Sequence, residues 1–276
     1  MACQQLIVCL CKKTRLVINL MLRLKTSFLI APILLGLFIS SAWSQSVDSI
    51  LSRLDQNYYY PQEQGLQSLT AQVQWEQLDV ASGSGKFLRN PDFVYSWRSD
   101  SFGLGDFELA EGQEHISKDR FQDLAEKIRP FRESIIPITL KQKFTDFNGR
   151  VDKTDGGKLT VKLTSKIDSR QNYKLLVDSN AWVIRKLRFQ QSHSPQNVEG
   201  EFLYTKLDGK PAISESRTRF EINGKEYTEV TSYRYKKVAG VWWIHRIKQT
   251  FKQEDDIVQT YVLRLSGFKP ILSSRQ

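Results

Sequence analysis

Residues 158–165 read KLTVKLTS, residues 172–178 read NYKLLVD and residues 181–191 read AWVIRKLRFQQ. In the first segment, apolar side chains alternate with Lys and Thr, which predicts a strand with one buried face and one wet face. The next two segments follow after short connections, one of them Ser179-Asn180. Strands joined in sequence by short turns pair antiparallel. The stretch therefore predicts an antiparallel meander.

The same alternation extends on both sides of this stretch. Upstream, residues 69–76 alternate, and Phe93, Tyr95 and Trp97 share one face of a further strand. Downstream, Asp208-Gly209 and Asn223-Gly224 are hairpin turn dipeptides. Turn signals come about every ten to fifteen residues up to the final apolar segments. A sheet of this length curls on itself.

Two amphipathic helices are expected beside the sheet, at residues 47–58 and 117–129. Ser46 and Ser117 are placed as their N-caps. Residues 130–148 are ambiguous between strand and irregular structure. The predicted fold is mainly β within the α+β class: an unclosed, strongly curved antiparallel β-barrel of about ten strands, with two or three helices plugging its concave face.

The N-terminal segment predicts a leader. The apolar run from Phe28 to Ser40 is about 13 residues long, whereas a spanning helix needs about 20. Residues 1–44 are therefore expected to be a signal peptide cut between Ser44 and Gln45, with Met21 as the suspected true start. An uncleaved anchor is the alternative. Residues 45–276 form a single domain in this interpretation.

Charge and cysteine content narrow the classes of function. The chain has 40 basic and 30 acidic residues, and its three cysteines all precede Met21. Residues 45–276 then carry a net charge of +5, spread along the chain, which does not indicate a nucleic-acid surface. Without cysteine, that part has no disulfide and no thiolate metal site.

Catalytic and metal-binding motifs are absent from the sequence. His115, His193 and His245 do not have metal-ligand spacing. There is no nucleophile elbow, phosphate loop or dinucleotide fingerprint. We therefore expect a protein that is not an enzyme and that has no cofactor and no metal.

Three segments resemble the Lol-type periplasmic carriers that sort outer-membrane lipoproteins. They are GSGKFLRNPDFVYSW at 83–97, NYKLLVDSNAWVIRKLRFQ at 172–190 and YKKVAGVWWIHRI at 235–247. The resemblance implies an unclosed barrel that shields acyl chains, a periplasmic location and a partner protein at the inner or outer membrane. We expect a monomer that does not bind nucleic acid.

The chain departs from the carriers at one position. They place an Arg directly before the Pro, an Arg that matters for handling cargo, whereas here Asn90 precedes Pro91 and Arg89 lies one residue earlier. One residue in a strand turns the side chain to the other face. Either a bulge returns Arg89 to the cavity side, or the role of that Arg is absent.

The candidate ligand-binding residues follow from the strand faces and the resemblance. The expected cavity lining consists of Trp75, Phe93, Tyr95, Trp97, Leu159, Val161, Leu187 and Phe189. These side chains also suit an ordinary barrel core. Arg89 and Arg185 are the expected polar contacts to a headgroup. Arg185 interrupts an apolar face. Its alternatives are a rim position facing solvent and an inversion of which strand face points inward, with Trp182 and Ile184 on the other face.

The sequence thus predicts an exported binding protein that shields lipid or lipoprotein acyl chains in a hydrophobic cavity. The alternative is an envelope-stress sensor or a protein-binding module on the same fold, also non-enzymatic.

Overall fold

The computed structural model describes residues 46–100, 104–112 and 116–273. The predicted signal peptide at 1–44, its cleavage between Ser44 and Gln45 and the suspected start at Met21 lie outside these residues. Within the described part of the chain, no helix is both long enough and apolar enough to cross a membrane.

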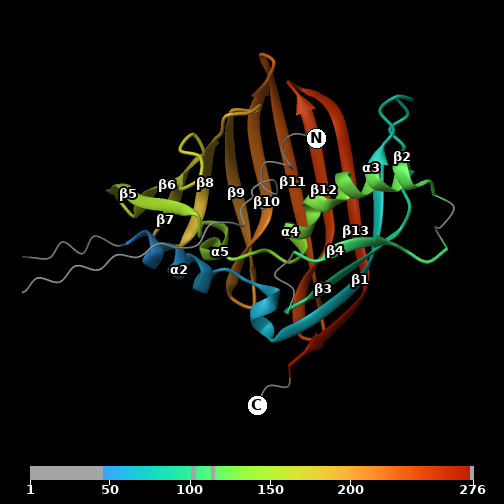
Figure 1. Ribbon diagram of the computed structural model, residues 1–276, viewed down its shortest axis with the longest axis horizontal. Helices are drawn as coiled ribbons and strands as arrows, with labels where there is room; N and C mark the ends of the chain where they lie inside the picture. The colour runs from blue at the N-terminus through green and yellow to red at the C-terminus, as the bar shows by residue number, and fades with distance from the viewer. Residues whose placement is uncertain (1–45, 101–103, 113–115, 274–276) are drawn as a thin grey trace, which may run out of the picture.

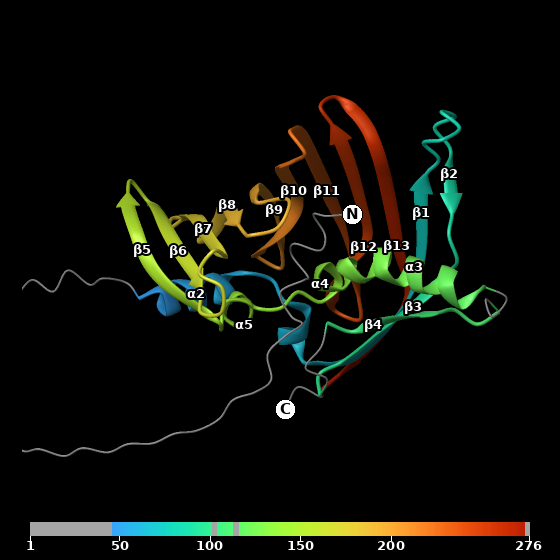
Figure 2. The ribbon, with the colours of Figure 1, turned by 45° about the horizontal axis from the view of Figure 1, so that its top comes forward.

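One antiparallel sheet of 13 strands dominates the described residues and curves strongly (Figures 1 and 2). Its order is β4-β3-β1-β13-β12-β11-β10-β9-β8-β7-β6-β5, and β2 pairs with β1. No strand pairing in these residues joins β4 back to β5, so the barrel is unclosed. The strands are β1 (Leu66–Leu78), β2 (Phe87–Arg89), β3 (Phe93–Arg98), β4 (Asp106–Leu109), β5 (Phe147–Asp155), β6 (Lys158–Ser165), β7 (Asn172–Asp178), β8 (Val183–Gln190), β9 (Asn197–Leu207), β10 (Lys210–Ile222), β11 (Lys225–Val238), β12 (Val241–Gln253) and β13 (Asp256–Leu272).

This architecture confirms the predicted fold class. The sheet has more strands than expected for two reasons. Pro91 cannot donate a ladder hydrogen bond, and it separates a short extra strand, β2, from β3, the strand predicted from Phe93, Tyr95 and Trp97. The strand β4 has only four residues, too few for a recognisable pattern, and the Gly-containing strand β5 lacks a clear alternation of apolar and polar residues.

Both expected helices form, with the expected caps. In α2 (Val47–Asn57), the Ser46 hydroxyl accepts from the Ser49 amide at 3.2 Å. In α3 (Lys118–Ile128), Ser117 accepts from the Arg120 amide at 3.4 Å. The ambiguous stretch is helical, with η3 (Arg129–Phe131), α4 (Arg132–Ile135) and α5 (Leu140–Lys143). A further turn, η2 (Pro61–Gln64), connects α2 to β1.

The helices divide most of the core into two large clusters along the curved sheet, and Tyr59, Leu207 and Ala212 form a small third cluster. The first, beneath α3, η3 and α4, joins Leu124, Ile128 and Phe131 to β1, β3, β12 and β13. The second, beneath α2 and α5, joins Leu54 and Phe144 to β6, β7 and β8. Figure 2 shows the two helical groups lying along opposite halves of the sheet.

A buried carboxylate ties α2 to the helical segment. Asp55 accepts hydrogen bonds from the amides of Leu140 and Lys141 at 2.7 and 3.0 Å, at the start of α5. It also accepts from the Tyr60 hydroxyl at 2.7 Å. The first amides of a helix have no partner within the helix, so Asp55 satisfies two of them from a distant part of the chain. This contact fixes α5 against α2.

Replacement of this carboxylate should destabilise the fold strongly. A hydrogen bond to a charged group contributes about 1.5–3 kcal/mol, and Asp55→Ala leaves three donors without their partner. We expect the free energy of unfolding in urea to fall by about 3 kcal/mol or more. Asp48→Ala, on the exposed first turn of the same helix, should cost less than about 1 kcal/mol. Equal losses in the two variants would contradict the role given to Asp55.

Candidate functional site

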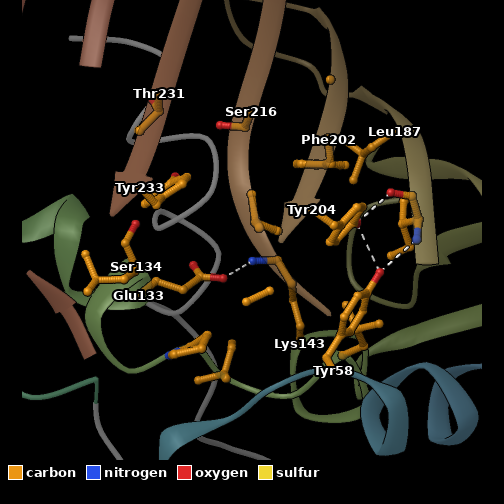
Figure 3. A pocket seen from close by; sticks show the side chains of 18 of the residues that line it. Tyr58, Glu133, Ser134, Lys143, Leu187, Phe202, Tyr204, Ser216, Thr231 and Tyr233 are labelled. Carbon is orange, nitrogen blue, oxygen red and sulfur yellow. Dashed lines mark hydrogen bonds and ion pairs between the residues drawn. The ribbon is translucent and has the colours of Figure 1, made fainter. Parts of the chain in front are cut away.

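A cavity of about 310 Å³ lies between the two core clusters. Its wall is the inner face of β7 to β12, and its floor comes from residues 58–61 and 130–144 (Figure 3). Most of the lining is apolar or aromatic. The apolar and aromatic lining includes Tyr58, Tyr59, Tyr60, Phe131, Ile135, Ile138, Leu140, Phe144, Tyr173, Leu175, Ile184, Leu187, Phe189, Val198, Phe202, Tyr204, Ala212, Ile213, Tyr233, Tyr235, Trp242 and Ile244.

A missing side chain helps to keep this space open. Gly200 lies on the inward face of β9 between Val198 and Phe202, which both line the cavity. A Cβ built at Gly200 would meet only the Phe202 ring within 4 Å, at an ordinary 3.7 Å. The wall therefore has a recess at Gly200, whereas the neighbouring inward residues Val198 and Phe202 carry larger side chains.

Two tyrosines close one end of the cavity around a break in the strand ladder. β8 and β9 pair only from Lys186 and Glu201 onward, which leaves the Ile184 main chain without a strand partner on that side. The Ile184 amide donates to the Tyr58 hydroxyl at 2.7 Å, and the Tyr204 hydroxyl donates to the Ile184 carbonyl at 2.6 Å. The two hydroxyls lie 3.1 Å apart (Figure 3). Since Tyr204 uses its proton on the carbonyl, Tyr58 donates to Tyr204.

Burial changes the acidity of this pair. Desolvation raises the pKa of Tyr58 to about 12, although its hydrogen bonds with Tyr204 and Ile184 act in the opposite direction. Desolvation also raises the pKa of Tyr204 well above its ordinary value, with neighbouring Tyr58 as the next cause. Both phenols are therefore neutral donors at neutral pH.

The cavity also has a polar side. On β11 and β12, Glu229 accepts from the Thr231 hydroxyl at 3.1 Å and from the Gln249 amide at 2.8 Å. In the floor, Lys143 of α5 donates to Glu133 of α4 (Figure 3). Each of these side chains lines the cavity. The space is thus mainly apolar, with a carboxylate on its wall and an ion pair on its floor.

Two of the eight predicted lining residues lie at the cavity. Leu187 and Phe189, on β8, are part of its wall. Leu159 and Val161 are instead packed in the core cluster beneath α2 and α5. The other four, Trp75, Phe93, Tyr95 and Trp97, are buried in the cluster beneath α3 and do not line the cavity.

The aromatic four lie outside the cavity because α3 fills the concave face above them. Phe121 of α3 stacks on Phe93, with the ring centroids 6.5 Å apart. Phe107 packs edge-on against Phe93 and tilted against Tyr95. These four residues are thus surrounded as in an ordinary barrel core, which is the alternative given for them above.

Arg185 does not point into the cavity. The β7–β8 register shifts between Leu176 and Val177, which makes Arg185 the extra residue of a bulge and turns its side chain outward. There it forms an ion pair with Asp178 at 3.0 Å. The side chain thus has the alternative position, facing solvent, and does not interrupt the cavity wall.

Arg89 is also outside the cavity. It lies in β2 opposite Glu76, and its side chain is 62% exposed. Its guanidinium contacts both carboxylate oxygens of Asp92, at 3.1 and 2.8 Å. No bulge returns Arg89 to the cavity side.

Several residues of the site were not predicted from the sequence. Phe202 and Tyr204 lie two residues apart on β9, but the exposed Leu203 between them is apolar, so the run FLY has no clear alternation to mark the inward face. Glu229 and Gln249 are polar residues at inward positions, and their face becomes evident only from the pairing of β11 with β12. Within the described ranges, no group of three or more His, Cys, Asp or Glu could hold a metal ion.

No protein-family model matches the chain, and no curated protein is significantly similar to it. Solved structures do resemble it. A LolA superfamily protein from Nitrosomonas europaea is 13% identical, with 84% of this chain and 96% of that one covered and a TM-score of 0.30. A DUF1329 family protein from Desulfovibrio piger is 9% identical, with 80% and 90% covered and a TM-score of 0.31.

A third structure is the outer membrane lipoprotein-sorting protein domain from Vibrio parahaemolyticus, described as putative. It is 10% identical, with 80% of this chain and 90% of that one covered and a TM-score of 0.29. Likeness at this level says nothing about ligand or mechanism, which depend on the cavity itself.

The tyrosine pair should make stability depend on alkaline pH. An unfolded tyrosine has a pKa of about 10, whereas Tyr58 in the folded protein has a pKa of about 12. The folded state holds this proton more tightly than the unfolded state does. The contribution of protonated Tyr58 to the free energy of unfolding is therefore complete below pH 10 and is lost as pH rises toward 12, by up to about 3 kcal/mol. The free energy of unfolding in urea, measured across this pH window, should decline less steeply with pH for Tyr58→Phe than for the wild-type protein. Tyr227→Phe is the control, and an unchanged slope in Tyr58→Phe would contradict the assignment.

Proposed function

We propose that the protein is a non-enzymatic carrier that holds an acyl chain of a lipid or lipoprotein in the cavity between its two core clusters. The observation that supports this most directly is the cavity of about 310 Å³ with mainly apolar walls. Its size is at the lower end of the range for small-molecule sites, about 300–1,000 Å³. Burial of an acyl chain is favourable by about 0.8 kcal/mol per methylene.

The chemistry of the lining favours binding over catalysis. Among the described residues that line the cavity there is no histidine or cysteine. Lys143 is engaged by Glu133, and Glu229 by Thr231 and Gln249. The hydroxyls of Tyr58 and Tyr204 are used on the main chain of β8. These groups orient the walls of a site, as expected for a carrier.

The proposed setting is the periplasm. The leader-like residues 1–44 and the resemblance to lipoprotein-sorting carriers support export, and either an inner-membrane or an outer-membrane protein is a suitable partner. The outward positions of Arg89 and Arg185 imply that the ligand's polar end is recognised by other residues. The binding role is therefore assigned to Leu187 and Phe189 and to the other apolar and aromatic residues that line the cavity.

Filling the cavity at Gly200 should abolish lipid binding without unfolding the protein. Gly200→Leu places a side chain in the open space, because its first atom has an ordinary contact there and points inward. We expect native mass spectrometry of gently purified wild-type protein to show a bound lipid and Gly200→Leu to show at most about a tenth of it. Leu203→Phe, on the outward face of the same strand, is the matched control and should keep the lipid.

Two results would contradict the carrier. The wild-type protein could be free of lipid after purification from its native compartment, or Gly200→Leu and Leu203→Phe could retain lipid equally. A lipid-free protein that retains one stoichiometric protein partner would instead support a protein-binding module.

A further inference from the structure

Three arginines lie side by side on the outward face of the sheet. In the strand register, Arg234 of β11 lies opposite Arg246 of β12, and Arg246 lies opposite Arg264 of β13. Arg234 comes between Tyr233 and Tyr235, which both line the cavity, so its own side chain points away from the cavity. We call Arg234, Arg246 and Arg264 the arginine row. Adjacent strands are about 4.8 Å apart, so the row extends over about 10 Å.

Elsewhere on the outward face, facing residues carry opposite charges. On β8 and β9, Lys186 lies opposite Glu201, and the two form an ion pair at 2.6 Å. Arg188 and Glu199 likewise face each other and form an ion pair at 2.8 Å. Opposite charges on facing residues stabilise a sheet, whereas like charges directly opposite each other destabilise it. The arginine row therefore costs the sheet stability, where other facing pairs contribute it.

The chain supplies little negative charge to the arginine row. Arg264 contacts Glu76 of β1 at 3.3 Å, and the other two arginines form no ion pair within the described part of the chain. The Nε of Arg246 is buried without a hydrogen-bond partner there. The positive charge also acts on His245: burial lowers the pKa of its imidazole, and Lys236 and the same two arginines lower that pKa further. The row is thus a concentration of positive charge with one carboxylate beside it.

We propose that the arginine row is a docking site for an acidic segment of a partner protein. A guanidinium binds a carboxylate through two parallel hydrogen bonds, which makes arginine well suited to recognise acidic side chains. Carboxylates of a partner would give Arg234 and Arg246 the counter-charge that the chain itself gives to Arg264. The repulsion between facing arginines would then be relieved in the complex. This site lies on the face opposite the cavity, so it goes beyond the proposed carrier function.

The narrow width of the arginine row favours a peptide over a membrane surface. Carboxylates border it on two sides. Glu76 lies on β1, and Glu215 of β10 lies opposite Ser232, two residues before Arg234 on the same face of β11. The phosphates of an anionic bilayer would be brought against these carboxylates as well, and such contacts between like charges are unfavourable. A single extended chain can follow the row between them.

The test measures binding of an acidic probe peptide. Hexaglutamate and hexaglutamine, each with the same rhodamine label, are titrated with the purified protein at low ionic strength, and fluorescence anisotropy gives the two dissociation constants. We expect hexaglutamate to bind at least roughly tenfold more tightly than hexaglutamine, and its affinity to fall as added salt screens the charges. Equal affinities for the two peptides, or no binding of hexaglutamate, would overturn the inference and leave the carrier function untouched.

A pair of matched double variants locates the binding. Arg234→Gln combined with Arg246→Gln removes two charges from the arginine row and should weaken hexaglutamate binding at least roughly fivefold. Lys186→Gln combined with Arg188→Gln removes the same total charge from the same face of the sheet, and it should change the affinity by less than about twofold. Equal weakening in the two double variants would overturn the assignment. The comparison of the two peptides on the wild-type protein decides the proposal even if a variant does not fold.

Vesicles distinguish a membrane surface from a peptide. The protein is mixed with vesicles of phosphatidylglycerol and phosphatidylcholine, and the fraction that floats with the vesicles is measured. We expect the arginine-row double variant to float to the same extent as the wild-type protein. Flotation that is lost in this variant but kept in the Lys186 and Arg188 control would assign the row to anionic lipid and overturn the acidic peptide.

Discussion

The carboxylate of Asp55 is the contact on which the shape of the site depends. It joins the end of α2 to the first amides of α5, more than eighty residues later, and it also binds Tyr60. Residues 58–61, which follow α2, and Leu140 and Lys143 of α5 are part of the cavity floor. This contact holds the start of α5 beside the end of α2, and Lys143 at the end of α5 contacts Glu133 of α4. A single buried acceptor thus joins three separate segments of the helical layer.

The cavity exists because the sheet is longer than the helices that cover it. α3 and α4 fill one half of the concave face, and α2 and α5 fill the other. Between them, the strands β9 to β11 face a thin connecting segment in place of a full helix. Gly200 adds to this gap, and the hydrogen bonds of Tyr58 and Tyr204 close its end. Incomplete coverage of a curved sheet thus leaves room for a cavity inside the protein.

The sequence predicted the sheet and the two main helices well, since both depend on local periodicity. KLTVKLTS and its neighbours form the strands they predict, and Ser46 and Ser117 cap their helices. The site was predicted poorly, because its location depends on which half of the inner face a helix covers. Trp75 and Phe93 have the same inward orientation as Phe189, yet α3 lies over the first two. Arg185 was misplaced for a different reason, since a bulge shifts the side-chain alternation and leaves no signal in the residue pattern.

The pairing of β13 has a consequence for how the chain acquires this structure. β13 is the last strand, and it lies between β12 and β1, whose residues are among the first in the sheet. The cluster that includes Trp75 and Phe93 therefore needs both ends of the chain, whereas the meander from β5 to β12 needs only neighbours. Contacts between distant residues form slowly because the intervening loop must close first. Folding should accordingly proceed from the middle outward, and β1 and β3 should remain unassembled until β13 is available to pair with β1.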